Sequence, residues 1–196
     1  METPKTPGAH SALSREEYRS LRATVQRRGN IRVVMALTTW SVWAVLATLA
    51  WTTGRPPMAG LIPLIVLAGG FEVVLSLHAG VERIGRYIQV AFEAGVSTPP
   101  AWEHVAMGMG NRWLSPGGLD PLFSSVFLIA AATNALPALT SGSTAEVVAA
   151  VVVHLGFAIR VILAKNFVRR QRAHDLKAVQ QVILSNPLVS RIQQER

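Results

Sequence analysis

Four stretches of mainly apolar residues divide the chain, at residues 31–52, 58–79, 121–139 and 145–165. A helix rises ~1.5 Å per residue, so about 20 apolar residues are enough to cross the hydrocarbon core of a bilayer. Outside these stretches the pattern becomes amphipathic, with charged residues interspersed among apolar ones. This pattern predicts an all-α polytopic membrane protein with four transmembrane helices.

Turn-forming residues join these apolar stretches in pairs. Residues 54–57 read Gly-Arg-Pro-Pro, and residues 140–144 form a second short polar connection. Connections this short usually join antiparallel neighbours. We therefore expect two antiparallel hairpins, in which the second and fourth helices carry cytoplasmic helical extensions, the fourth as far as Ser185.

The segment before the first apolar stretch has helical signals of its own. Ser14 and Glu17 match a capping box, which predicts that a helix begins at Ser14, and Gly29 with Asn30 predicts a break before residue 31. Two interpretations remain open for this segment: a basic amphipathic helix lying on anionic lipid headgroups, or a flank that sets topology. The candidate headgroup or partner contacts at the two ends of the chain are Arg15, Arg19, Arg22, Arg27, Arg28, Arg169, Arg170 and Arg172.

The long connection at residues 80–120 contains a second candidate surface helix. Apolar residues recur at helical spacing from Trp102 to Trp113, although Gly108 and Gly110 weaken the pattern. The segment is either a helix in the cytoplasmic headgroup plane or a loop packed against the bundle.

Composition and charge support a membrane protein and suggest its orientation. The chain is 50% hydrophobic and 15% charged, has no cysteine, and carries a net charge of +8. Lys and Arg concentrate before residue 32, after residue 165 and within residues 80–120, so the positive-inside rule predicts cytoplasmic termini in a multi-pass protein of the cell (inner) membrane. The expected organisation is a cytoplasmic tail and basic helix at 1–30, a transmembrane domain at 31–165, and a cytoplasmic basic helix and tail at 166–196.

Polar residues within the apolar stretches are the candidate functional residues, because they are expensive to place in lipid. The predicted intramembrane polar cluster consists of Glu72, Ser76, Asn134, His154 and Arg160. Counting helical rise from the two turns brings Glu72 and Arg160 to one level, which predicts an ion pair between them. The same count brings His154 level with Asn134, and a hydrogen bond between these two is the simple expectation. The alternative is that Glu72 lines an aqueous path.

Chemistry that needs a metal or cofactor has little support in the sequence. His78 and Glu82 are four residues apart and are weak candidates for a metal site, but an i,i+4 hydrogen bond is the simpler expectation. The sequence identifies no cofactor, and none of the common nucleotide-binding or hydrolase motifs is present.

The resulting functional hypothesis is a non-enzymatic integral membrane protein that acts by assembly, as a scaffold, complex subunit or self-associating unit. Its expected partners are anionic lipid headgroups and either copies of itself or other membrane-protein subunits, whereas nucleic acid is not expected. The first alternative is a small ion channel or transporter subunit with a Glu/His/Arg polar path. The weaker alternative is a membrane enzyme or a metal or haem carrier.

Overall fold

The computed structural model describes residues 7–53, 56–92 and 121–185. Its elements are α1 (Pro7–Thr52), the short 3-10 helix η1 (Pro57–Gly60), α2 (Leu61–Ala91), α4 (Pro121–Ser141) and α5 (Thr144–Ser185). The described residues contain no strand, and this agrees with the all-α prediction. The surface helix predicted near Trp102 to Trp113 lies outside the described residues.

All four long helices are long and apolar enough to cross a membrane, as the hydropathy pattern predicts. Many large apolar side chains point outward from them, including Val34 at 58%, Ile65 at 70% and Val152 at 62% exposure. Soluble monomers rarely expose contiguous apolar surface on this scale. The exposed faces therefore have the chemistry of a surface that contacts lipid.

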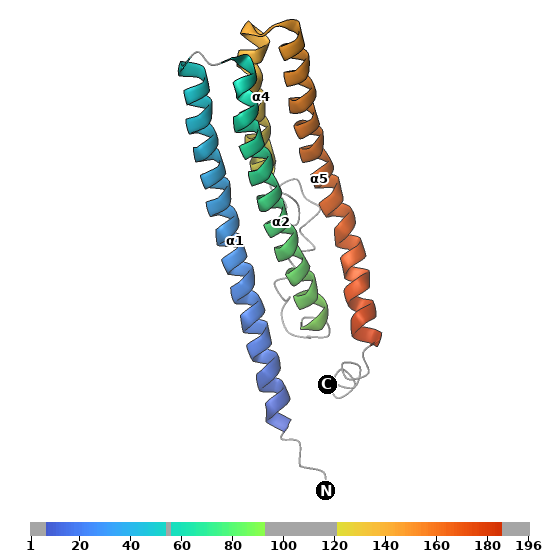
Figure 1. Ribbon diagram of the computed structural model, residues 1–196. Coiled ribbons are helices and arrows are strands. Elements are labelled where there is room, and N and C mark those ends of the chain that lie inside the picture. The colour runs from blue at the N-terminus through green and yellow to red at the C-terminus, as the bar shows by residue number, and fades with distance from the viewer. Residues whose placement is uncertain (1–6, 54–55, 93–120, 186–196) are drawn as a thin grey trace.

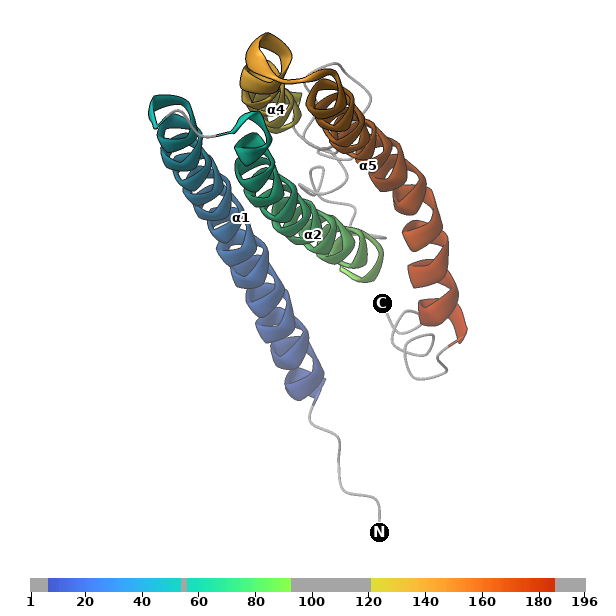
Figure 2. The ribbon, with the colours of Figure 1, turned by 45° about the horizontal axis from the view of Figure 1, so that its top comes forward.

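The helices form an elongated bundle in which α2 is central (Figure 1). α1 packs mainly along α2, while α5 packs against both α2 and α4. The N-terminal end of α1 and the C-terminal ends of α2 and α5 lie toward the same end of the bundle (Figures 1 and 2). This end carries the charged parts of the three helices.

α1 corrects two expectations for the N-terminal segment. It begins at Pro7, ahead of the predicted start at Ser14, and it continues through Gly29 and Asn30 without a break. Proline suits a first helical turn, because no intrahelical hydrogen bond needs its missing N–H. A single helical glycine costs only about 1 kcal/mol relative to alanine, which contacts on both sides of Gly29 can offset.

Those contacts also determine the direction of the basic segment. Tyr87 donates a hydrogen bond to Glu17 at 2.9 Å, and the Tyr18 ring lies 5.7 Å from the Phe92 ring. The basic part of α1 therefore runs along the end of α2 as a continuation of the apolar part. Because α1 is one unbroken helix, its basic part keeps the direction of its apolar part and does not turn at the expected break before residue 31.

Aromatic side chains form the centre of the apolar bundle. The Phe71 ring is edge-on to Phe127 at 5.4 Å and to Phe157 at 6.0 Å, and Trp40 of α1 lies 5.7 Å from Phe127. Each such pair contributes roughly 0.5–1.5 kcal/mol beyond burial itself. These contacts join all four helices at the depth of the apolar segments.

Candidate functional site

Polar side chains connect the helices at successive levels along α2. From the η1 end of α2 toward its C-terminal end, the structure pairs Asn134 with His154, Glu72 with Arg160, His78 with Arg32, and Arg86 with Glu82 and Asp175.

The first level is a buried amide site between α4, α5 and η1. The Asn134 side-chain amide donates to the Gly60 carbonyl at 2.5 Å and lies 3.2 Å from Nε2 of His154. Nδ1 of His154 lies 2.7 Å from the Ala150 carbonyl, which can only accept, so Nδ1 carries the proton. Nε2 then accepts from Asn134. This confirms the predicted contact between His154 and Asn134 and adds the Gly60 carbonyl, which the sequence did not indicate.

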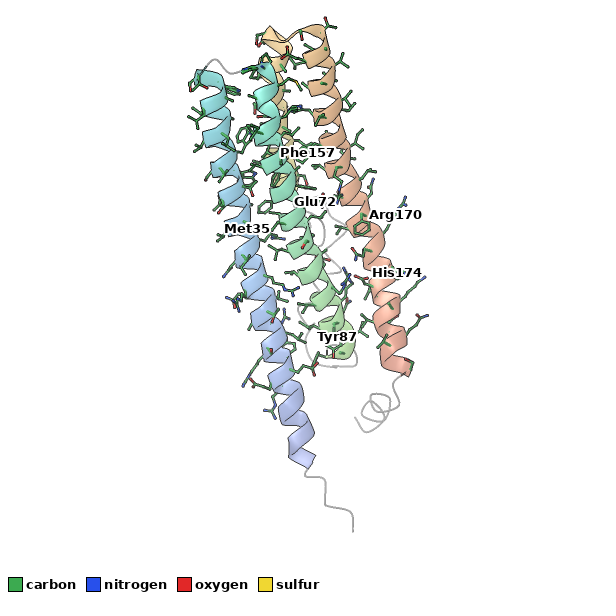
Figure 3. All side chains as sticks on the ribbon, in the orientation of Figure 1. Met35, Glu72, Tyr87, Phe157, Arg170 and His174 are labelled. Carbon is green, nitrogen blue, oxygen red and sulfur yellow. The ribbon has the colours of Figure 1, made fainter. Side chains whose placement is uncertain are left out.

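The second level is the Glu72–Arg160 pair, which is present as predicted. Nη2 of Arg160 lies 2.8 Å from Oε2 of Glu72, on the side of α2 that faces α5 (Figure 3). The two side chains nevertheless remain 44% and 49% exposed. This ion pair therefore lies at the surface of the apolar bundle and not in its core.

The predicted polar cluster is thus divided. Asn134 and His154 form one site and Glu72 and Arg160 form another, on different helix pairs. Ser76 lies exposed on α2, one turn beyond Glu72. The structure does not join the five residues into one continuous polar path among the residues it describes.

The third level joins α1 to α2 through Arg32 and His78. Nη1 of Arg32 lies 2.8 Å from Nδ1 of the buried His78 ring. Because a guanidinium can only donate, Nδ1 of His78 accepts. The Arg32 guanidinium also lies 5.4 Å from the centre of the Phe123 ring.

The fourth level is a buried charge cluster, the Arg86 cluster, formed by Glu82, Arg83, Arg86 and Asp175. Arg86 is only 1% exposed, and it donates to Glu82 at 3.1 Å and to Asp175 of α5 at 2.7 Å. Arg83 lies 3.7 Å from the same Asp175 carboxylate but is 63% exposed. Two carboxylates and two guanidinium groups make the cluster formally neutral.

Sequence reasoning missed the Arg86 cluster, although one signal was available. Asp175 is the only acidic residue of α5 apart from Glu146, and it stands among basic residues. An isolated acidic residue in a basic helical segment indicates an ion pair with a cation, and the sequence leaves open which one. The partner is 89 residues away in sequence, so only the packing of α5 against α2 identifies it.

The weak metal-site candidates, His78 and Glu82, contact different cations. His78 accepts from Arg32, whereas Glu82 accepts from Arg86. Among the described residues no group of three or more His, Cys, Asp or Glu side chains is placed to hold a metal ion.

The predicted basic contact residues occupy several kinds of position. Arg15, Arg19, Arg27, Arg28 and Arg170 are exposed, and Arg170 is visible on α5 in Figure 3. Arg22 is half-buried and donates to the Tyr18 hydroxyl at 3.0 Å. The side chains of Arg169 and Arg172 lie outside the described part of the structure.

Taken together, these contacts are chemically suited to joining helices. The carboxylates of Glu72, Glu82 and Asp175 each face a guanidinium. His78 and His154 each accept a hydrogen bond from a neighbouring helix. Comparison with protein-family models, curated proteins and solved structures finds no match to this chain.

Proposed function

We propose that this chain is an integral membrane protein that acts by assembly, with copies of itself or with other membrane-protein subunits. Its four helices would cross the cell membrane as two antiparallel hairpins, with both termini and the 80–120 connection in the cytoplasm. The basic residues before residue 32 and after residue 165 support this orientation through the positive-inside rule. The ends of α2 and α5 beyond the apolar stretches would then form cytoplasmic extensions.

The half-exposed Glu72–Arg160 pair is the observation that carries the proposal. A charged side chain in the middle of a bilayer costs about 2.5–3.5 kcal/mol on insertion scales, and pairing removes only part of that cost while both groups still face lipid. A protein surface that covers the pair would remove its contact with acyl chains. Assembly therefore explains why two charges stand at the surface of apolar helices.

Small residues beside the pair favour close approach of another helix. An added Cβ at Gly69 or at Gly156 would meet nothing within 4 Å, and Ser76 is exposed on the same side of α2 as Glu72. Small side chains let transmembrane helix backbones approach and gain van der Waals contact. We call the exposed surface formed by Gly69, Glu72, Ser76, Gly156 and Arg160 the α2–α5 face.

Cysteine crosslinking tests the proposal without background, because the natural chain contains no cysteine. Gly69→Cys places a thiol on the α2–α5 face, and its open surroundings tolerate the added side chain. In native membranes we expect it to form a disulfide-linked dimer, or a bifunctional maleimide adduct with a second protein.

A matched control comes from the opposite side of the bundle. Val45 is 59% exposed on α1, so Val45→Cys presents a thiol to lipid at comparable accessibility. Crosslinking at position 69 but not at 45 supports an interface at the α2–α5 face. Equal yields at both positions, or no adduct at either, would contradict the assembly proposal.

The same exposed pair supports a second candidate, a small channel or transporter subunit. In that case Glu72 and Arg160 would border water and not a protein partner. Purified protein in liposomes should then carry an ion flux that changes with Glu72→Gln. If flux is absent, or insensitive to that substitution, this candidate fails.

A further inference from the structure

We propose that the α2–α5 face binds the same face of a second copy of this chain, around a twofold axis that runs along the bundle. In this dimer Glu72 of each copy lies opposite Arg160 of the other copy. The inference rests on the assembly proposal and names its partner. It follows from the matched order of exposed side chains on α2 and α5.

α2 and α5 run in the same direction, side by side, with a nearly constant offset (Figure 1). Glu72 contacts Arg160, 88 residues later in the chain, and Arg86 contacts Asp175, 89 residues later. The offset therefore changes by only one residue between these two contacts. A residue of α2 is thus level with the residue of α5 that follows it by about 88 positions.

Exposed residues on the two helices follow the same order at the same levels. Within each helix they are three or four residues apart and so share one side. The α2 stripe consists of Ile65, Gly69 and Glu72, and the α5 stripe consists of Val152, Gly156 and Arg160. Each stripe presents a large apolar residue, then a glycine, then a charged residue. With the offset of 88, the members of each matched pair lie within one residue, or ~1.5 Å of helical rise, of the same level.

Twofold symmetry makes this surface complementary to itself. Copies of one chain enter a membrane in the same orientation, so an axis that relates two of them follows the membrane normal and leaves every residue at its own level. An axis along the midline of the α2–α5 face places α2 of one copy opposite α5 of the other. Apolar side chains then meet apolar side chains, Gly69 meets Gly156, and Glu72 meets Arg160 of the partner copy.

The ion pair within each copy leaves capacity for this second contact. Nη2 of Arg160 lies 2.8 Å from Oε2 of Glu72, and the two side chains remain 44% and 49% exposed. A guanidinium has five N–H donors and a carboxylate has two oxygens, so one such bond uses only part of each group. In the dimer the four charges alternate in sign, and each carboxylate lies between two guanidinium groups. The opposed glycines allow the helix backbones to approach closely enough for this arrangement.

Charge exchange between separate chains tests the inference. Full-length chains with two different affinity tags are co-expressed and extracted in mild detergent, and the amount of the second tag captured through the first is measured. Glu72→Arg places two cations on the face, and Arg160→Glu places two anions there. Each variant should capture its own copy about tenfold less than the unsubstituted chain does, because like charges meet. Co-expression of Glu72→Arg with Arg160→Glu should restore capture, because two cations then face two anions.

A second variant covers the case in which the charge variants fail to fold, since both also lose the ion pair within the chain. Gly156→Phe keeps that pair and adds its side chain where a Cβ meets nothing within 4 Å, so the single copy can accept it. The dimer cannot, and capture of its own copy should fall about tenfold. Val45→Phe is the matched control on α1, where Val45 is 59% exposed, and should leave capture unchanged.

Each outcome decides the inference. Restored capture in the mixed pair, or loss in Gly156→Phe with retention in Val45→Phe, supports it. The second-copy assignment is overturned if unsubstituted copies do not capture each other, if folded charge variants show no rescue, or if Gly156→Phe captures its own copy as well as Val45→Phe does. Failure of the assembly proposal looks different. A crosslink from Gly69→Cys to another protein would keep that proposal while the second copy is ruled out.

Discussion

The Arg86 cluster and the Glu72–Arg160 pair use the same chemistry at opposite kinds of position. Arg86 is 1% exposed and lies in the part of α2 beyond its apolar stretch, between α2 and α5. Glu72 and Arg160 are 49% and 44% exposed and lie within the apolar stretches. The charges are thus inside the bundle where the chain is polar, and at its surface where the chain is apolar.

This difference shows that exposure alone does not describe the environment of a charge. A half-exposed pair in water is well solvated and contributes only about 0–1 kcal/mol. The same pair against lipid lacks that solvation, and its stability depends on whatever covers it. The buried cluster depends instead on complete pairing inside the protein, because removing one member leaves the others in low dielectric.

Arg86→Ala should have the largest effect and is the strongest test of the buried side of this comparison. The substitution removes the cation between Glu82 and Asp175, and breaking a buried pair in this way typically costs about 3–5 kcal/mol. We expect a corresponding fall in the free energy of unfolding, measured by denaturant titration in detergent micelles. Arg83→Ala is the control, since Arg83 is 63% exposed and lies 3.7 Å from Asp175. Similar losses of unfolding free energy in both variants would show that burial does not determine the contribution of Arg86 to stability.

The exposed side of the comparison is tested by a double-mutant cycle on Glu72→Gln and Arg160→Gln. If lipid or a protein partner covers the pair, each single substitution should cost about 2–3 kcal/mol in liposomes, by leaving one charge without its counterion. The double variant should then recover much of that loss. The cycle is read from the free energy of unfolding in lipid. A coupling energy near zero would indicate that water reaches both side chains.

Gly70→Ala tests the steric packing of α1 on α2 in the apolar part of the bundle, without changing any charge. A Cβ at position 70 would overlap the side chain of Thr39 on α1, and Thr39 is short, buried and hydrogen-bonded to the Met35 carbonyl at 2.7 Å. Overpacking of this kind costs about 1–3 kcal/mol. The neighbouring Gly69→Ala is the control, because its Cβ meets open space. Equal unfolding midpoints for the two variants would contradict close packing of α1 on α2.

Asn134→Ala should have the smallest effect on stability in these four tests. It removes hydrogen bonds to the Gly60 carbonyl and to His154, and interhelical hydrogen bonds within membranes average about 0.6 kcal/mol, with a maximum near 1.7. Thr133→Val on the same helix is the control, because among the described residues the Thr133 hydroxyl donates to carbonyls of α4 itself. A loss of unfolding free energy as large as that of Arg86→Ala would show that neutral hydrogen bonds contribute as much to stability as buried charges.

Two parts of the polar network were accessible from the sequence. Helical rise is a one-dimensional quantity, so counting residues from the turns was enough to bring Glu72 level with Arg160 and Asn134 level with His154. Both contacts are present. Counting could not indicate that one is buried and the other half-exposed, because exposure depends on how each helix is rotated about its axis.

Hydropathy and length along the chain by themselves determined that this protein is all-helical with four helices able to span a membrane, since each helix satisfies its own backbone hydrogen bonds. Tertiary structure decided which side chains meet. In the folded protein α1 is continuous through Gly29, Arg86 pairs with Asp175, and Arg32 contacts His78. The physical reason is that a helix's rotation and neighbours follow from packing between distant segments, on which the local order of residues carries little information.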